Sequence, residues 1–485
     1  MSTFPEYETF DAIGLGQLIA TGELTAAEVL QAAIERIEHL NPTINAVCHS
    51  WYDEARAVAN AALPKGPFSG VPFALKDLHV LYKGQPISNG CRYWDGFVAD
   101  HDATLTERYR QAGLVILGRT NSTELGLSCE TAPILFGPTR NPWDLSRSCG
   151  GSSGGAAAAV ASGMFPIAHA TDGGGSIRIP SFCCGVFGMK VSRGRNPFGP
   201  DLGEGWNGLA TGHAVSRTVR DNAALLDATH GPAPGDPYAA PPPTGNYLGE
   251  LERDPGRLRI AFMTATHEGK EVDPQCRRAV EETAALLETL GHHVENQAPR
   301  VSIAEMKRAT RVLVACNVMN VLNMRAAATG REATEQDVEK VTWAWTREAL
   351  SLSGADYAQA VTTIHQVGRE MGVFFESYDV LLTPTFAAPA PPINTVDMMT
   401  ESLDEYYQTL RRYSAFTLLF NVSGGPAMSV PLCTTTDGLP LGLQFGAQLG
   451  DEGTLYRLAS QLEKANPWHT RKPEHFGLAR SISHS

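Results

Sequence analysis

The pattern of apolar and polar positions near the N-terminus predicts a helix followed by a buried strand. Thr25 and Glu28 form a capping-box pattern where the helix begins. Apolar residues then recur at helical spacing up to the next proline: Val29, Leu30, Ala33, Ile34, Ile37 and Leu40. A short apolar run at 70–77 ends on a charged pair. We expect a strand there that brings Lys76 to its end.

Helical and strand-like patterns continue to alternate along the chain, which predicts a layered α/β core. Residues 104–112 have helical spacing, and 114–118 form an apolar run. A proline-rich stretch, 231–245, predicts a loop. The remaining expected elements are strands at 258–263, 378–382, 428–432 and 441–445, and helices at 156–161, 274–290, 300–375 and 452–463.

Length and charge limit the classes of protein that fit. A chain of 485 residues, 43% hydrophobic and 19% charged, buries a sizeable core as two lobes or as one large domain with insertions. The net charge of −13 and the lack of a basic run argue against nucleic-acid binding. No signal-like N-terminus and no uninterrupted apolar stretch of ~18–20 residues stand out. We therefore expect a cytoplasmic protein with no membrane partner.

Cysteine and histidine spacing gives no metal or disulfide pattern. The nine cysteines are scattered, and they form no CxxC pair. The 14 histidines form no HExxH motif. We expect reduced, mostly buried thiols, no metal and no cofactor.

The least ordinary part of the sequence is rich in glycine, serine and alanine. The loop 150–155, Gly-Gly-Ser-Ser-Gly-Gly, lacks the Gly-Lys-Ser/Thr that a nucleotide P-loop needs. Alone it is more typical of a flexible surface linker. The segment 171–180 is more specific, because three glycines directly before Ser176 can aim successive N–H groups at one oxyanion. Ser176 is therefore a candidate nucleophile.

Ser176 needs a base, and the usual one is missing from its surroundings in sequence. No GxSxG elbow is centred on Ser176, which argues against an α/β-hydrolase arrangement for this serine. His169 lies close by, but a lone histidine beside an apolar run is more typical of a packed, hydrogen-bonded residue. The base must come from elsewhere in the chain.

Three segments together resemble the amidase signature family, in its order and at its spacing: 72–77 with Lys76, the loop with Ser152, and the segment with Ser176. The resemblance extends to 384–385, 421–427 and 438–444, so it spans nearly the whole chain. It implies an α/β amidase signature fold with a central mixed, twisted sheet covered by helices on both faces. Within one domain, 1–485, it implies a signature core at 65–200 and a mostly helical insertion or cap at 246–400.

The resemblance also implies a role for each matching residue. Lys76 is the base, Ser152 the bridging serine with a cis peptide bond, and Ser176 the nucleophile. An unprotonated lysine requires burial that lowers its pKa from ~10.4. We expect Asp77 to point away from it. The oxyanion hole is assigned to the N–H groups of Gly173, Gly174, Gly175 and Ser176, and loop support to Ser153, Thr171, Asp172 and Arg178.

Some positions depart from the family pattern. Cys149 stands where proline is common, and Val191-Ser192 stands where Pro-Thr is common. Gly173 replaces a bulkier residue, which we expect to widen the oxyanion side.

Three further runs, 140–143, 420–424 and 462–468, look similar to bacterial amidases that include the nylon-oligomer cyclic-dimer hydrolases. This narrower likeness implies a small or medium amide, linear or cyclic, as substrate. The expected pocket walls are Ser128, Cys129, the helical stretch around Cys316 and the loop of Asn421. Cys316 itself is more typical of a packing residue than of a substrate contact.

Two other functions stay open at this point. The same residues would serve a glutamine-hydrolysing subunit of a transamidating complex, or a binding protein that keeps the fold without catalysis. An amide hydrolase that acts alone, as a homodimer, is the function we favour.

Overall fold

The computed structural model describes residues 4–269 and 271–478. Its N-terminal part contains a three-stranded sheet of order β1-β3-β2, in which β2 and β3 are parallel and β1 and β3 antiparallel. This part consists of α1 (Ala12–Thr21), α2 (Ala26–Ile44), β1 (Val47–Ser50), α3 (Tyr52–Ala59), β2 (Pro72–Lys76), α4 (Thr104–Gln111) and β3 (Val115–Thr120). The expected strand that ends at Lys76 is confirmed.

A larger sheet of the described chain has eight strands in the order β10-β9-β11-β13-β12-β7-β8-β6. The β10-β9-β11 pairs are parallel and the others antiparallel, so the sheet is mixed. The strands are β6 (Ile167–Asp172), β7 (Phe187–Lys190), β8 (Thr211–Ser216), β9 (Arg259–Phe262), β10 (His293–Asn296), β11 (Val380–Pro384), β12 (Ala427–Thr434) and β13 (Pro440–Gly446). The predicted α/β class is confirmed.

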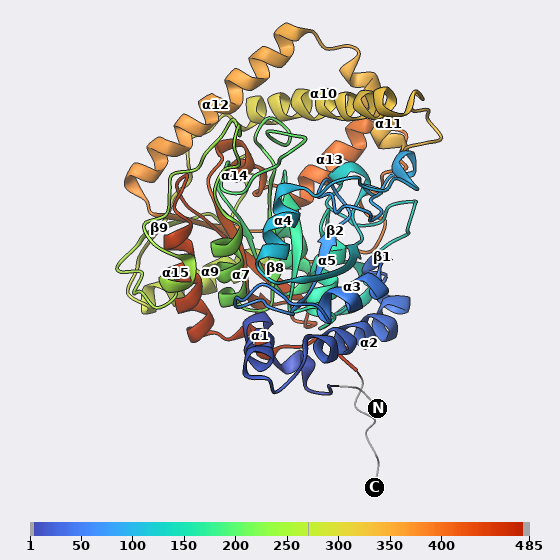
Figure 1. Cartoon of the computed structure of the whole chain (residues 1–485). Helices are drawn as coiled ribbons and strands as arrows, with labels where there is room; N and C mark the ends of the chain where they lie inside the picture. The colour runs from blue at the N-terminus through green and yellow to red at the C-terminus, as the bar shows by residue number, and fades with distance from the viewer. Residues whose placement is uncertain (1–3, 270, 479–485) are drawn as a thin grey trace.

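Helices flank this sheet and connect its strands (Figure 1). They are α5 (Gly154–Ala161), α6 (Arg178–Cys184), α7 (Val219–Thr229), α8 (Tyr247–Glu250), α9 (Pro274–Thr289), α10 (Ile303–Thr329), α11 (Lys340–Ala349), α12 (Gly354–Ser377), α13 (Leu403–Tyr413), α14 (Leu418–Ser423) and α15 (Glu452–Ala465). Shorter elements are η1 (Tyr7–Thr9), η2 (Arg92–Trp94), η3 (Glu124–Gly126), β4 (Arg140–Asn141), β5 (Asp144–Ser148) and η4 (Trp468–Thr470). The proline-rich loop at 231–245 has no helix or strand, as expected.

The start of α2 follows its sequence signal, but its end does not. The Thr25 side chain accepts the Glu28 N–H, and the Glu28 carboxylate accepts the Thr25 N–H, which completes the capping box. The helix then continues through Pro42 to Ile44 instead of ending before the proline. It ends where Asn45 adopts a left-handed conformation, with φ 57°. Pro42 has no N–H to donate to the carbonyl four residues earlier, so the helix lacks that one bond near its C-terminal end.

The expected helical cap is narrower in the structure than the range 246–400. Strands β9, β10 and β11 fall inside that range and belong to the large sheet. Only α10, α11 and α12 form a purely helical excursion, which lies at the opposite end of the molecule from α1 and α2 (Figure 1). Sheet strands and cap helices alternate here because the chain leaves the sheet after β10 and returns at β11.

Helix α10 has an unusual composition. Among the described helices of at least 18 residues, it alone is long and apolar enough to cross a membrane by length and composition. Val318 and Leu322 of this helix are buried in the hydrophobic core, and Asn317 and Val321 line a cavity described below. The apolar residues of α10 thus pack in the hydrophobic core or line the cavity.

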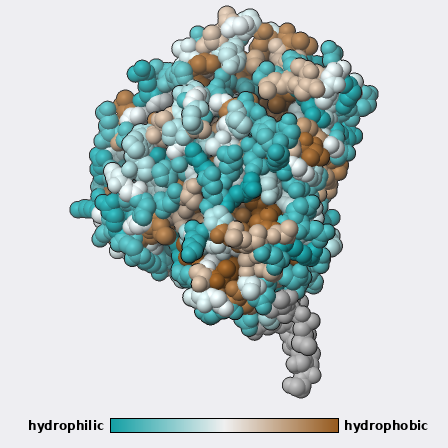
Figure 2. Space-filling view, in the orientation of Figure 1, coloured by the Kyte–Doolittle hydropathy of each residue, from teal (hydrophilic) through white to brown (hydrophobic). Residues whose placement is uncertain are grey.

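One hydrophobic core connects the two ends of the described chain. Its largest cluster includes residues from Ala26 to Trp468, and it contains Ala156–Ala161 of α5. Large apolar side chains that remain exposed, such as Val98, Leu350 and Val373, are far apart in sequence. The face seen in Figure 2 is mainly hydrophilic, with small hydrophobic patches. Isolated exposed apolar residues of this kind are normal on protein surfaces.

The backbone at Gly155 in α5 leaves no room for a side chain. A Cβ there would lie 2.4 Å from the Asn121 nitrogen and 2.6 Å from the Ala46 oxygen, and both are backbone atoms. Overpacking of this kind costs about 1–3 kcal/mol. We expect Gly155→Ala to lower the melting temperature by a few degrees, measured by circular dichroism.

Gly354→Ala is the matched control for Gly155→Ala. No atom lies within 4 Å of a Cβ at Gly354, the first residue of α12. Alanine is also the better helix former, so the melting temperature should stay the same or rise slightly. Identical melting of the two variants would contradict the close packing of α5.

Candidate active site

Lys76 lies at the point where the two sheets come together. It is the last residue of β2, in the small sheet, and it is fully buried. Its backbone N–H donates to Nδ1 of His169 on β6, in the large sheet, at 3.2 Å. His169 is buried as well, so the expectation of a packed, hydrogen-bonded histidine is met. The bond fixes the position from which the lysine side chain starts.

The amine of Lys76 is surrounded by hydroxyl groups. Its Nζ lies 2.7 Å from Ser152 Oγ and 2.8 Å from Thr171 Oγ1. Burial lowers the pKa of Lys76 well below its ordinary value, while the negative charge of Asp172 acts in the opposite direction. The net shift favours the uncharged amine, which is the form that can accept a proton. Thr171 was expected to support the loop, and its hydroxyl also contacts the Lys76 amine directly.

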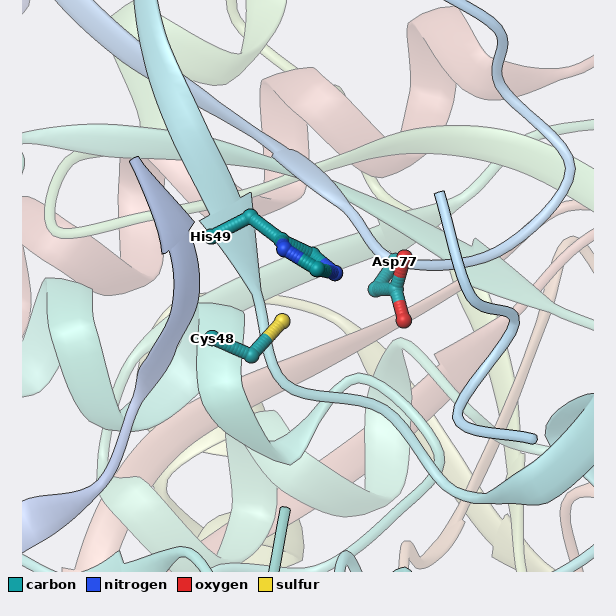
Figure 3. Close-up of side chains that lie close together, drawn as sticks. All are labelled: Cys48, His49 and Asp77. Atoms are coloured by element: carbon teal, nitrogen blue, oxygen red, sulfur yellow. The ribbon is translucent and has the colours of Figure 1, made fainter. Parts of the chain in front are cut away.

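The carboxylate of Asp77, the residue after Lys76, points away from the lysine amine and toward the loop after β2. Its carboxylate oxygens accept the backbone N–H groups of Ser88 at 2.8 Å and Gly90 at 3.1 Å. It lies beside Cys48 and His49, and the possible ligand atoms of these three residues are all within 4.8 Å of one another (Figure 3). The carboxylate thus supports the loop after β2, and the expectation that it points away from the Lys76 amine is met.

The cluster of Cys48, His49 and Asp77 is already engaged in hydrogen bonds. His49 Nε2 lies 2.8 Å from the Ser88 hydroxyl, and the Cys48 thiol donates to the Arg119 carbonyl at 3.6 Å. The positive charge of Arg119 also acts on both Cys48 and His49. A nearby guanidinium opposes the binding of a cation at these ligands, so the donor set fits a metal poorly.

Ser152 lies in the loop that precedes α5. The Gly151–Ser152 peptide bond is cis, as the family resemblance implied. The next residue, Ser153, donates its hydroxyl to the Thr171 carbonyl at 3.1 Å and its N–H to the Ser176 carbonyl at 3.3 Å. These bonds hold the loop against the segment that carries Ser176, the supporting role expected for Ser153.

Ser176 follows the three glycines and is partly exposed. Gly175 adopts φ 132°, and a Cβ there would lie 2.5 Å from Thr417 Oγ1, so the turn requires glycine. The Gly175 N–H donates to Asp172 Oδ1 at 2.8 Å. This corrects the expectation that it belongs to the oxyanion hole.

The other expected oxyanion donors keep their N–H groups available. Among the described residues, no hydrogen-bond acceptor faces the backbone N–H of Gly173, Gly174 or Ser176. The donor set available to a developing oxyanion is therefore reduced from four N–H groups to three.

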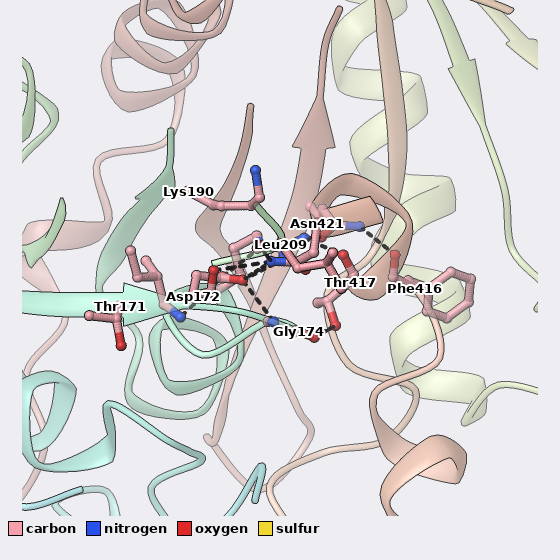
Figure 4. A network of polar contacts seen from close by, with 12 residues as sticks. Thr171, Asp172, Gly174, Lys190, Leu209, Phe416, Thr417 and Asn421 are labelled. Atoms are coloured by element: carbon pink, nitrogen blue, oxygen red, sulfur yellow. Dashed lines mark hydrogen bonds and ion pairs between the residues drawn. The ribbon is translucent and has the colours of Figure 1, made fainter. Parts of the chain in front are cut away.

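Asp172 and Arg178 form a pair that holds the glycine turn, and Figure 4 shows Asp172 of this pair with Gly174 and Asn421. The Arg178 guanidinium donates to both Asp172 oxygens, at 2.9 and 2.8 Å, and both residues are fully buried. Burial acts to raise the pKa of Asp172, but Arg178 and Asn421 outweigh it and hold that pKa below its usual value. The supporting role expected for Asp172 and Arg178 agrees with these contacts.

Asn421 belongs to this network and not to the pocket wall. It is fully buried, and its Nδ2 donates to Asp172 Oδ1 at 2.8 Å and to the Leu209 carbonyl at 3.1 Å. Its Oδ1 accepts from Arg178 at 2.7 Å. The expected contact with substrate is corrected, because all the polar atoms of the side chain face the turn.

A cavity of about 360 Å³ opens beside the two serines. Ser152, Thr171 and Ser176 all line it. Within residues 4–269 and 271–478, no hydrogen bond joins the hydroxyl groups of Ser152 and Ser176. Catalytic hydrogen bonds are often long before substrate binds, so the shared cavity is the observation that relates the two serines.

A second cavity, of about 70 Å³, is also lined by Ser176. Ser128 and Cys129 line it, as expected of pocket residues. Cys316 lines neither of these two cavities in the described chain; it is half-buried on α10, about 100° around the helix from Asn317, which does line the larger one. Cys316 is therefore removed from the expected pocket wall, while its neighbours on α10 belong to that wall, as expected.

Two residues of the cavity walls were missed in the sequence. His79 lines the larger cavity, and burial followed by the charge of Lys76 lowers its pKa to about 4. Trp206 lines both cavities, and its ring lies 3.0 Å from where a Gly173 Cβ would be. The indole thus fills the space that Gly173 was expected to leave open. The only sequence signal was the closeness of His79 to Lys76.

Comparison with known proteins gives the family. The family model described as Amidase matches residues 28–456. The 6-aminohexanoate-cyclic-dimer hydrolase of Pseudomonas sp. (strain NK87) is 37% identical over 97% of this chain and 98% of its own. A solved 6-aminohexanoate cyclic dimer hydrolase with substrate has a TM-score of 0.92 at 36% identity, covering 96% of this chain and 99% of that one.

A bacterial aryl acylamidase described as an amidase signature enzyme has a TM-score of 0.85 at 27% identity, covering 95% of this chain and 97% of that one. The predicted amidase signature fold is confirmed by these neighbours. The chain is a hydrolase of amide C–N bonds. It belongs to the amidase signature family.

Proposed function

We propose that this protein cleaves a small amide through an acyl-enzyme on Ser176, with Ser152 as proton relay and Lys76 as base. The observation that carries the proposal is the 2.7 Å contact between the buried Lys76 amine and the Ser152 hydroxyl. A buried, uncharged amine can take the serine proton, and a charged ammonium cannot. Ser176 and Ser152 line the same cavity, which supports a proton relay from the nucleophile to this pair.

The proton transfers balance over the two halves of the reaction. As Ser176 Oγ attacks the carbonyl carbon, its proton passes to Ser152, and the Ser152 proton passes to the Lys76 amine. The oxyanion is stabilised by the N–H groups of Gly173, Gly174 and Ser176. The ammonium then returns a proton through Ser152 to the leaving nitrogen as the C–N bond breaks. Water repeats the attack and releases the acid.

The substrate class follows from the cavity and the relatives. A volume of about 360 Å³ is within the ~300–1,000 Å³ typical of small-molecule sites. One close relative is named for the hydrolysis of a cyclic amide dimer, and a more distant one for aryl acylamides. We propose a small or medium amide, linear or cyclic. A cytoplasmic location and a homodimer remain part of the proposal.

The two alternative functions make different demands. A glutamine-hydrolysing subunit of a transamidating complex would need its partner subunits for activity. Cleavage of a panel of aryl, alkyl and cyclic amides by the purified chain alone supports the free hydrolase. A binding protein without catalysis would not be labelled at Ser176 by a serine-directed phosphonate, which peptide mass spectrometry detects.

Removal of the nucleophile or the base should stop the reaction. We expect Ser176→Ala to abolish turnover and Lys76→Met to lower kcat by several orders of magnitude, because members of such a relay act as a unit. Steady-state kinetics on the best amide of the panel measures both.

The matched controls are Ser351→Ala and Lys65→Met, which change exposed residues of the same types. Both should keep the wild-type rate. A Ser176→Ala or Lys76→Met variant that folds and retains the wild-type rate would rule out the assignment.

The pH profile should report the protonation of Lys76. Burial lowers the pKa of this amine, so kcat/KM should rise with pH as the ammonium loses its proton and level off well before the pH at which a free lysine titrates. His79, with a pKa of about 4, is neutral over that range. A flat profile from mildly acidic to alkaline pH would count against Lys76 as base.

A further inference from the structure

Ser176 lies where two cavities of unequal size meet. Ser176, Gly173 and Trp206 line both the cavity of about 360 Å³ and the cavity of about 70 Å³. An amide whose carbonyl carbon is placed at Ser176 has one substituent on each side of the C–N bond. The two cavities are therefore the natural places for the two arms of the substrate, and the arm in the smaller cavity must be short.

The wall of the smaller cavity is apolar apart from a few residues. Leu127, Ile179, Val314 and Leu410 are among its apolar lining. In the part of the chain that the structure describes, Arg411 is the one charged residue that lines this cavity. An apolar wall with a single cation suits an alkyl chain that carries a negative group.

Arg411 has few partners for its charge. It is on α13, where Nη2 donates to the Tyr407 hydroxyl at 3.0 Å and the guanidinium lies 4.8 Å from the centre of the Tyr407 ring. Its Nε is buried and has no acceptor among residues 4–269 and 271–478. Within the same residues, no carboxylate lies within ion-pair distance of Arg411. Arg311 on α10, by contrast, is paired with both Glu348 and Asp404.

A buried donor without an acceptor is unfavourable, and more so when the group is charged. A ligand that supplies the acceptor recovers this energy when it binds. Arg411 also lines a surface hollow of about 600 Å³, next to Lys307 and Arg412. The guanidinium is thus at the outer end of the smaller cavity, where a polar end group can stay in contact with solvent.

We propose that Arg411 binds a carboxylate at the end of the substrate's shorter arm, so that the enzyme prefers amides with a short alkyl chain ending in a carboxylate. The Arg411 Nε and one Nη would donate to the two carboxylate oxygens, the paired geometry that guanidinium groups favour. The inference rests on the proposed function for the position of the scissile bond. Beyond that function, it identifies the end group of the substrate's shorter arm as a carboxylate.

Binding of a carboxylate can be tested without catalysis. Isothermal titration calorimetry would measure hexanoate and 1-hexanol, its neutral analogue, against the wild type, Arg411→Gln and Arg412→Gln. We expect Arg411→Gln to weaken hexanoate binding at least about tenfold, since bonds to charged groups are the stronger ones. It should leave 1-hexanol unchanged.

Arg412→Gln is the matched control, because Arg412 is the next residue on α13, carries the same charge and lines only the surface hollow. It should bind hexanoate as the wild type does. Equal loss in the two variants would show general charge attraction and overturn the proposal. Absence of wild-type binding at about 10 mM hexanoate would overturn it too.

Kinetics with matched amides tests the preference itself. One pair is glutaryl p-nitroanilide and pentanoyl p-nitroanilide; the other is 5-acetamidopentanoate and N-pentylacetamide. In at least one pair the wild type should favour the carboxylate about tenfold or more in kcat/KM, and Arg411→Gln should remove the preference through KM. Turnover without any preference overturns the Arg411 proposal alone. Failure to acylate Ser176 with every compound overturns the proposed function, while the calorimetry still decides on Arg411.

Discussion

The burial of one amine between two sheets governs the arrangement of this site. Lys76 is fully buried at the end of β2, and its neighbours there are the hydroxyls of Ser152 and Thr171 and not a carboxylate. An ammonium in such a place would lose its hydration without gaining a counterion in contact, so the uncharged form is favoured. The acid-base chemistry of the protein depends on this placement.

The remaining parts of the site keep the serines close to that amine. Asp172 accepts the Gly175 N–H and pairs with Arg178, which fixes the turn that leads to Ser176. Ser153 ties the loop of Ser152 to the same turn. Because these bonds are buried, each is expected to hold its geometry against solvent. Thr171 takes part in both, because its carbonyl accepts the Ser153 hydroxyl and its own hydroxyl contacts the Lys76 amine.

Much of this was predictable from the sequence, for reasons that differ by residue. The strand that ends at Lys76 followed from a short apolar run, and the α/β class from alternating patterns. Lys76, Ser152 and Ser176 are distant in sequence, so only the family resemblance brought them together. Asn421 was assigned to the pocket wrongly, since a sequence does not say which way a buried amide points. His79, Trp206 and Arg411 were missed because cavity walls come from segments with no shared pattern.

A direct titration of the Lys76 amine is the sharpest test of its role as base. Nuclear magnetic resonance of protein with labelled lysine side chains would follow the titration of each amine, with the Lys76 signal assigned by its loss in Lys76→Met. Lys190 is also buried, and its pKa is lowered to about 7, so the same experiment should show a second lysine that loses its proton early. We expect Lys76 to lose its proton well below pH 10.5, the ordinary pKa of a lysine amine. A Lys76 amine that stays protonated to that pH would contradict its role as base.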